Sequence, residues 1–204
     1  MTTVVYFHGF ASGPQGPSPK TDLIRALGHD VALIATDGDY RPTGYRAAFA
    51  RLGLGPMAPL VLMGTSLGGF WAQRLGQELG RPWIALNPAI QPSQSLQRYI
   101  GPNTRFDTGG AFTWTAADCA AYVAEEQFAL PSDLPGLLIL AEDDEVLDYR
   151  LAKDLAGSAR LVVLPRGGHQ LHNTADYGAA VDTFFREGGK GDLATNAQER
   201  ASKI

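Results

Sequence analysis

One serine of this chain stands in a pattern that could make it a nucleophile. Residues 64–68 read Gly-Thr-Ser-Leu-Gly and follow directly after the apolar run 60–63. The G-x-S-x-G pattern is typical of a nucleophile elbow, a sharp strand-to-helix turn that holds the serine backbone in a conformation avoided by residues with a Cβ. Gly64 and Gly68 remove side chains that would collide across this turn. Because chance alone gives roughly 0.1 matches in a chain of this composition, the prediction of Ser66 as the nucleophile depends on its partners.

A serine hydroxyl needs a base within hydrogen-bond reach, and the base needs an orienting acid. After a nucleophile elbow these partners follow in the chain order acid, then histidine. Residues 165–169 read Pro-Arg-Gly-Gly-His and follow the apolar run 161–164. The glycines allow a sharp turn, so we predict His169 as the general base. His172 is the alternative, and we expect His29 to be a surface residue.

A cluster of carboxylates follows the apolar run 137–141, where the orienting acid is expected. We predict Asp144 as the acid because Val146 follows two positions later and can anchor the loop. Asp143 is the second choice, and Glu142 and Asp148 are less favoured. Most carboxylates of such a cluster are solvated loop residues, and we expect that of the others here.

The oxyanion of an acyl-transfer transition state requires two aligned backbone N–H donors. One is expected from Leu67, directly after the nucleophile, where a helix N-terminus also favours negative charge. The second is expected from Phe10, in the glycine-containing loop that follows the first apolar run. We interpret His8 as shaping this loop through hydrogen bonds. Such chemistry needs no metal and no cofactor.

The elements that must position these residues alternate along the chain. Short β-rich runs and helical segments follow one another, which indicates an α/β fold with a mostly parallel central sheet and helices on both faces. We expect strands at 4–7, 31–35, 60–63, 83–86, 137–141 and 161–164, and helices at 19–27, 44–52, 70–79, 150–156 and 175–185. Ser18 and Pro19 are expected to start the first helix.

Two stretches depart from this alternation. The aromatic-rich segment between Asn87 and Gly136 is too long for a simple connection, so we predict a cap-like insertion at about 89–136, with helices of its own, near the site. Residues 1–187 are then a single domain, and 188–204 a polar C-terminal tail.

Composition excludes several classes of function. The chain has 204 residues, a net charge of −4, and 17 Lys and Arg residues that form no basic run, so we expect no nucleic-acid partner. Its one cysteine, Cys119, is predicted to be a small buried helix residue. No apolar stretch approaches the ~18 residues of a membrane span, and no leader pattern stands at the N-terminus, so we expect a cytoplasmic location and no membrane partner.

The motifs together resemble the α/β-hydrolase superfamily and, more narrowly, the small bacterial esterases of the YqiA/YcfP type. The resemblance extends from residue 4 to about 185 and rests on residues 6–10 with Ser12 and Pro14, 64–70, 87–89, 144–150, 167–169 and 176–177. Residues 144–150 (Asp-Glu-Val-Leu-Asp-Tyr-Arg) are its most specific part. It implies a compact hydrolase acting on short acyl esters, with the triad Ser66, Asp144 and His169.

We therefore predict a serine hydrolase, a carboxylesterase that works through an acyl-enzyme on a small-molecule acyl ester. The insertion is expected to supply an apolar acyl pocket lined by Phe10, Phe70 and Trp114. Because fold and triad do not determine the substrate, a thioesterase, a small-amide hydrolase and a carbon–carbon bond hydrolase remain alternatives. A further alternative is a non-catalytic protein of hydrolase fold that binds a small ligand. The oligomeric state is left open.

Overall fold

A six-stranded parallel sheet forms the centre of the molecule. The computed structural model describes residues 2–55, 58–126 and 134–187. The strands stand in the order β2-β1-β3-β4-β7-β8, and each neighbouring pair is parallel. Their bounds are β1 (Thr3–Phe7), β2 (Asp30–Leu33), β3 (Leu60–Thr65), β4 (Trp83–Leu86), β7 (Gly136–Ala141) and β8 (Arg160–Leu164). All six predicted strands are thereby confirmed.

The central strands are apolar throughout because both faces of the sheet are covered. In β1, Val5 and Phe7 belong to one buried cluster, while Val4 and Tyr6 belong to the other. This alternation follows from the two-residue period of a strand, which sends successive side chains to opposite faces. An uninterrupted apolar run is therefore what such a strand requires.

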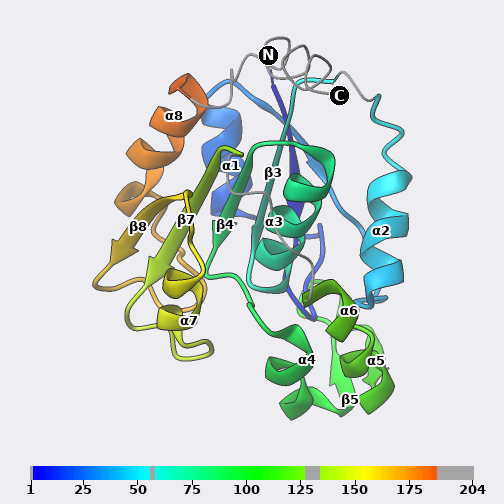
Figure 1. Ribbon diagram of the computed structural model, residues 1–204. Coiled ribbons are helices and arrows are strands. Elements are labelled where there is room, and N and C mark those ends of the chain that lie inside the picture. The colour runs from blue at the N-terminus through cyan, green and yellow to red at the C-terminus, as the bar shows by residue number, and fades with distance from the viewer. Residues whose placement is uncertain (1, 56–57, 127–133, 188–204) are drawn as a thin grey trace, which may run out of the picture.

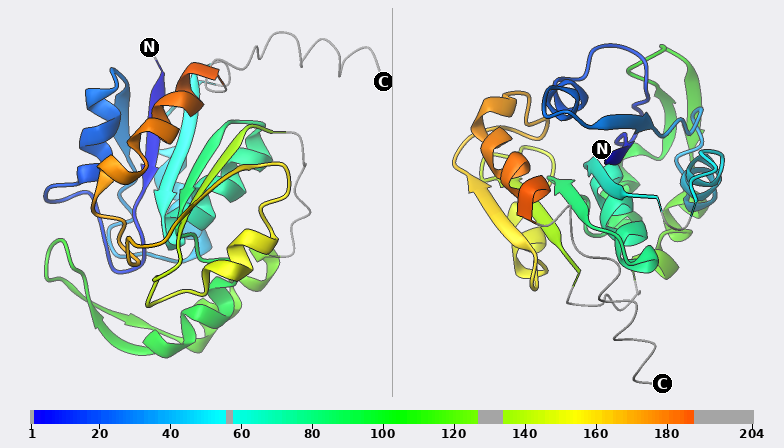
Figure 2. Two further views of the ribbon diagram at one scale, coloured as in Figure 1. Left: turned by 90° about the vertical axis from the view of Figure 1, so that its left-hand side faces the viewer. Right: turned by 90° about the horizontal axis from the view of Figure 1, so that it is seen from above.

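Helices cover the two faces of the sheet (Figures 1 and 2). On one face lie α1 (Pro19–Ala26) and α8 (Gly178–Glu187), which pack with Val4 and Tyr6. On the other lie α2 (Pro42–Ala50), α3 (Leu67–Leu79) and α7 (Tyr149–Asp154). Ser18 caps α1, its side chain accepting the Thr21 N–H at 3.5 Å. None of the helices in the described ranges is long and apolar enough to cross a lipid bilayer.

Some element boundaries differ from the predicted ones. Helix α3 begins at Leu67 rather than at residue 70, because the elbow passes directly into the helix. Helix α2 begins at Pro42, the residue type that favours a first helical position. The predicted helix 175–185 is divided into the 3-10 turn η2 (Thr174–Asp176) and α8, with Tyr177 at φ −132° between them.

The insertion lies beyond the carboxyl ends of the strands, at the bottom of Figure 1. It contains helices, but also an antiparallel hairpin that we did not predict. Its elements are α4 (Pro92–Ser95), η1 (Gln97–Tyr99), β5 (Gly101–Thr104), β6 (Ala111–Trp114), α5 (Ala116–Ala120) and α6 (Val123–Glu126). Cys119 is buried in α5, as predicted. Residues 127–133 of the insertion and the predicted tail 188–204 lie outside the described residues.

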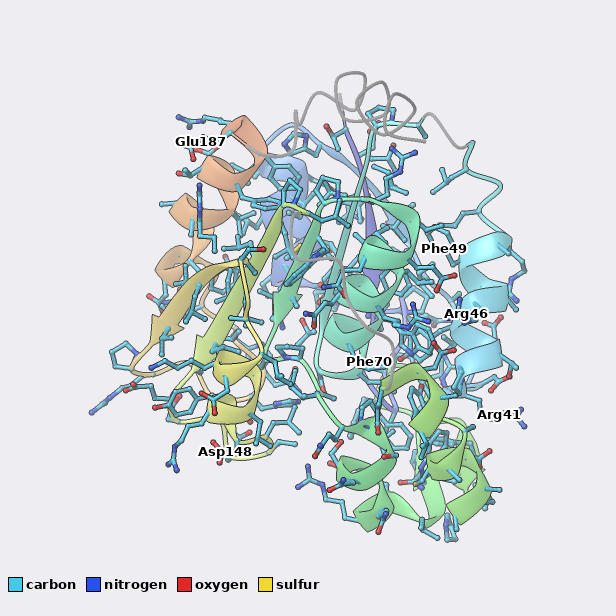
Figure 3. The ribbon with its side chains drawn as sticks, viewed as in Figure 1. Arg41, Arg46, Phe49, Phe70, Asp148 and Glu187 are labelled. Atoms are coloured by element: carbon cyan, nitrogen blue, oxygen red, sulfur yellow. The ribbon has the colours of Figure 1, made fainter. Side chains whose placement is uncertain are left out.

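Ion pairs join the insertion to the sheet domain. Arg46 of α2, labelled in Figure 3, donates to Glu125 of α6 at 2.8 Å and to Glu78 of α3 at 3.0 Å. Arg74 of α3 pairs with the same two carboxylates, at 3.0 Å from Glu125 and 2.8 Å from Glu78. Because four charges share this network, we expect it to hold α6 more firmly than an isolated surface pair would.

Candidate active site

Ser66 lies on a strained turn between β3 and α3. Its backbone adopts φ 57° and ψ −123°, and its side chain makes no capping hydrogen bond, which leaves the hydroxyl free to face the cavity. A Cβ on Gly64 would lie 2.2 Å from the Gly68 carbonyl oxygen, and one on Gly68 would lie 2.0 Å from that of Phe7. The two glycines are therefore required by backbone contacts around the serine, one across the turn and one against β1.

The backbone around Ser66 is held by β4 and by the segment that follows it. The Ser66 N–H donates to the Leu86 carbonyl at 2.9 Å. The Ser66 carbonyl accepts from Phe70 N–H at 3.1 Å and from Ala89 N–H at 3.0 Å. These bonds hold a conformation that a serine would not adopt by itself.

The structure brings His169 and Asp144 together. The His169 Nδ1 lies 2.9 Å from Asp144 Oδ2 and 3.0 Å from Oδ1. Asp144 Oδ1 also accepts the N–H groups of Val146 and Leu147, at 2.8 and 2.9 Å. Burial acts to raise the pKa of Asp144, but the His169 hydrogen bond and these N–H groups outweigh it, so the pKa lies below its ordinary value. Asp144 is thus an ionised carboxylate that orients an imidazole.

The neighbouring carboxylates hold the backbone of the histidine loop rather than the imidazole. Asp143 Oδ1 accepts the Gly168 N–H at 2.8 Å, and Glu145 Oε2 accepts the His169 N–H at 2.9 Å. Both carboxylates are exposed loop residues, as expected, and in addition they hold the backbone of the histidine loop. Asp148 caps α7 by accepting the Arg150 N–H at 3.0 Å (Figure 3).

The other candidates lie apart from the Asp144–His169 pair. Glu142 accepts a weak hydrogen bond from the Tyr149 hydroxyl at 3.4 Å. His172 lines the same cavity as His169 and is exposed. His29, expected at the surface, is instead partly buried, with its ring 4.1 Å from that of Phe185.

Asn87 connects three loops of the site, a role that sequence reasoning missed. Its Nδ2 donates to the carbonyls of Gly168 at 2.9 Å and His169 at 3.1 Å, while its Oδ1 accepts the Ala141 N–H at 2.8 Å. It adopts a positive φ of 39°. The available signal was a polar residue directly after the buried strand β4, where the carboxyl ends of the strands meet.

The two expected oxyanion donors belong to segments that adjoin Ser66. Leu67 is the first residue of α3, so its N–H has no acceptor within the helix. The loop of Phe10 approaches closely, because a Cβ on Gly9 would lie only 3.9 Å from Ser66 Oγ. His8 supports this loop through its carbonyl, which accepts the Tyr45 hydroxyl at 2.8 Å. Among the described residues its imidazole Nε2 has no hydrogen-bond partner, so His8 holds the loop through its backbone rather than its ring.

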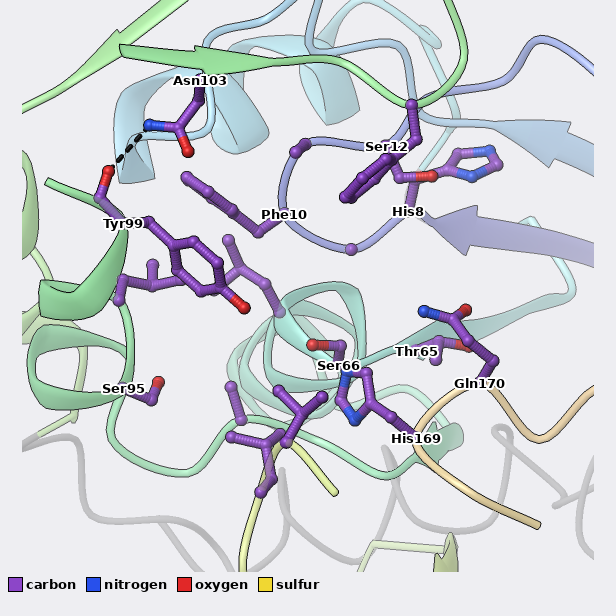
Figure 4. A pocket seen from close by; sticks show the side chains of 18 of the residues that line it. His8, Phe10, Ser12, Thr65, Ser66, Ser95, Tyr99, Asn103, His169 and Gln170 are labelled. Atoms are coloured by element: carbon purple, nitrogen blue, oxygen red, sulfur yellow. Dashed lines mark hydrogen bonds between the residues drawn. The ribbon is translucent and has the colours of Figure 1, made fainter. Parts of the chain in front are cut away.

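Ser66 and His169 line one cavity of about 800 Å³ (Figure 4). Phe10 and Tyr99 form an aromatic wall on one side of Ser66 in this view. Phe70 and Trp114, predicted as lining residues, do not line it. Both are buried in the core cluster, where each packs against Tyr122. Trp114 supports the wall from behind, because its ring contacts that of Phe10 at a centroid distance of 5.0 Å.

Comparison with known proteins places the chain among related folds. Residues 3–186 match the family described as "Uncharacterised protein family (UPF0227)". A UPF0227 protein of Yersinia enterocolitica is 25% identical over 186 residues, covering 89% of this chain and 97% of the relative. Alpha/beta hydrolase domain-containing protein 10 from mouse has a TM-score of 0.70 at 17% identity, covering 91% of this chain and 90% of that chain. Est1E from Butyrivibrio proteoclasticus has a TM-score of 0.69 at 17% identity, covering 91% and 87%. The predicted α/β-hydrolase fold is confirmed.

Proposed function

The chain belongs to the UPF0227 family, and we propose that it is a serine hydrolase, a carboxylesterase that cleaves short acyl esters through an acyl-enzyme. One observation carries the proposal. Ser66, on a strained elbow, shares a cavity with His169, whose Nδ1 is bound to Asp144. Because Nδ1 is engaged, Nε2 is the nitrogen left to take the serine proton.

The reaction follows from these positions. His169 removes the proton from Ser66 as the hydroxyl attacks the ester carbonyl, and Asp144 stabilises the imidazolium that forms. The N–H groups of Phe10 and Leu67 bind the oxyanion. His169 then donates its proton to the leaving alcohol, and water repeats the sequence to release the acid.

Names of structural neighbours support an ester as substrate. One neighbour is the esterase domain of a Rhodothermus marinus protein, which has a TM-score of 0.63 at 18% identity. Est1E has also been solved with ferulic acid bound. The aromatic wall of Phe10 and Tyr99 is suited to an apolar part of such a substrate.

Labelling with a fluorophosphonate probe tests the proposal, because the probe reacts only with an activated serine. We expect wild type to be labelled and Ser66→Ala not. Ser95→Ala is the matched control, since Ser95 lines the same cavity away from the elbow and its loss should leave the label in place. A folded wild-type protein that takes no label would exclude the hydrolase and favour a non-catalytic ligand-binding protein.

A substrate panel distinguishes an esterase from a thioesterase on the same residues. We expect p-nitrophenyl esters of short acyl chains to be hydrolysed with higher kcat/KM than the matching thioesters. The opposite order, with labelling of Ser66 intact, would identify a thioesterase.

A further inference from the structure

One cationic side chain of the cavity is buried without a counterion. Lys20 lines the cavity of Ser66 and is only 6% exposed. Within the described part of the chain it forms no hydrogen bond or ion pair through its side chain. The ammonium nitrogen is not among the fully covered, unpartnered atoms of the described residues, so it is open to the cavity while most of the side chain is covered. A largely desolvated cation without a partner is unfavourable, and proteins seldom retain one. Burial accordingly lowers the pKa of Lys20 to about 8.

The position of Lys20 in its helix adds to this cost. It is the second residue of the eight-residue helix α1, directly after Ser18 at the N-cap and Pro19. The N-terminus of a helix carries a partial positive charge and unpaired N–H groups, so it favours an anion and disfavours a lysine. An anion bound beside them would therefore stabilise both the Lys20 ammonium group and the N-terminus of α1.

A second polar group near Lys20 also has no partner. The Nε2 of His8 is fully covered and has no hydrogen-bond partner in the described ranges. Burial lowers the pKa of His8 to about 4; the charge of Asp107 acts to raise it and that of Lys20 to lower it further. Asp107 does not supply the counterion for Lys20, because its carboxylate pairs with Arg105 at 2.8 Å. The imidazole of His8 is neutral at pH 7, so Lys20 is the cationic group on this side of the cavity.

The charges around the cavity have the opposite sign from the whole molecule. The chain carries a net charge of −4. Among the described residues that line the cavity, the charged ones are Lys20 and Arg98, and none is an aspartate or glutamate. A lining of one sign raises the local concentration of ligands of the opposite sign.

We propose that the substrate carries an anionic group, a carboxylate or a phosphate, which Lys20 binds while the ester bond lies at Ser66. This inference rests on the proposed hydrolase and names its substrate class. Figure 4 indicates the arrangement: Phe10 and Tyr99 lie on one side of Ser66, and His8 lies on the other. The substrate then has an apolar part on the aromatic side and an anionic part on the side of Lys20.

Binding can be measured without turnover, in Ser66→Ala protein titrated calorimetrically with glutarate or with inorganic phosphate. We expect at least one of the two to bind, and the Lys20→Met change to weaken that binding about tenfold or more, because a charge-assisted hydrogen bond is lost. Lys20→Arg should retain most of the affinity, and Lys153→Met, which removes an exposed lysine of α7, all of it. The tighter of the two anions identifies the group.

Kinetic measurements show whether the anionic group belongs to the acyl part or to the alcohol part of the ester. p-Nitrophenyl butyrate is compared with p-nitrophenyl hemiglutarate, which carries a carboxylate in its acyl part, and with the butyrate ester of p-hydroxybenzoate, which carries it in the alcohol part. Wild type should prefer one charged ester over the neutral one, and Lys20→Met should reduce that ratio of kcat/KM values about tenfold. We expect the melting temperature of Lys20→Met to be no lower than that of wild type, since a largely desolvated, unpaired charge is removed.

Two results would overturn the inference. One is that neither anion binds at millimolar concentration. The other is that the protein with the Lys20→Met change binds the anion as tightly as the protein that keeps Lys20. Failure of the hydrolase itself gives a different pattern, because Lys20-dependent anion binding would persist in a protein that the fluorophosphonate does not label.

Discussion

Asp144 uses one carboxylate for two tasks. Its Oδ1 accepts the N–H groups of Val146 and Leu147, and the same carboxylate faces His169 Nδ1. The contacts with Val146 and Leu147 fix the carboxylate within its own loop. The contact with His169 fixes the imidazole, which belongs to a different loop. Asp144, which orients the proposed base, is therefore itself oriented by backbone donors, and this limits how far the His169 ring can move.

Replacing Asp144 by asparagine removes the negative charge of the side chain and keeps its size and shape. The amide oxygen of the new side chain can still accept from Val146 and Leu147, but the neutral amide no longer stabilises an imidazolium. We expect kcat of Asp144→Asn on p-nitrophenyl butyrate to fall about 10³- to 10⁴-fold with little change in the circular dichroism spectrum. A decrease below tenfold would show that another acid, such as Asp143, orients the base.

The same variant tests the pH dependence of stability. The pKa of Asp144 is lower in the folded protein than in the unfolded chain, so its charge stabilises the fold above the unfolded pKa, and this contribution is lost as pH falls through the folded pKa. The difference in melting temperature between wild type and Asp144→Asn should be largest above about pH 4 and shrink in more acidic buffers. A difference that is constant from pH 7 to pH 3 would contradict this assignment of the charge.

Sequence reasoning at this scale can propose residues that are marked by their neighbours in the chain. Ser66, Asp144 and His169 each follow an apolar strand, and Val146 distinguishes Asp144 from Asp143. Asn87 also follows an apolar strand, but its neighbours in the chain do not show which loops it binds, and Lys20 has no such signal. Their surroundings are created by contacts distant in the chain, from the histidine loop in one case and from the cavity in the other.

Among the elements, the turns at the carboxyl ends of the strands hold much of the backbone strain. Non-glycine residues with positive φ include Ala11 after β1, Ser66 after β3 and Asn87 after β4. Such conformations persist only where surrounding bonds enforce them, and they cluster at functional sites. The loop of Ala11 is further fixed by the insertion, because the Ala11 carbonyl accepts the Phe106 N–H at 2.7 Å, where the hairpin passes the loop in Figure 2.

The elbow itself should tolerate no added side chain. In Gly68→Ala the new Cβ would lie 2.0 Å from the Phe7 carbonyl oxygen, a backbone atom that cannot move without disturbing β1. We expect a loss of about 3 kcal/mol or more in the free energy of unfolding, measured by urea denaturation. Gly55→Ala is the control, since nothing lies within 4 Å of that Cβ. Equal stabilities for the two variants would show that the elbow can relax.

The strands were easier to predict than the insertion for a physical reason. A strand buried on both faces must be apolar, and this marks it in the sequence. Strand β5 reads Gly-Pro-Asn-Thr and alternates between half-buried and exposed positions, so Thr104 is its only β-forming residue and it has no apolar run. It forms because β6 pairs with it, with Gly101 opposite Trp114.

For the molecule as a whole, two layers of helices support a sheet whose carboxyl edge carries the site, and the insertion covers that edge (Figure 1). The ion pairs of Arg46 and Arg74 with Glu125 join the insertion to α2 and α3. The cavity thus lies between two parts of one chain that are far apart in sequence. Its basic lining in an acidic protein is a property of this assembly, which composition alone does not reveal.

The formation of an acyl-enzyme on Ser66 tests the central claim most directly. p-Nitrophenyl butyrate has a good leaving group, so acylation should outpace the release of butyrate. The protein is mixed rapidly with this ester, quenched in acid and examined by mass spectrometry of the peptide that contains Ser66. The account predicts a single butyryl group on Ser66 of wild type, lost on longer incubation and absent in Ser66→Ala. Hydrolysis of the ester with Ser66 unmodified, or a butyryl group on another residue, would contradict it.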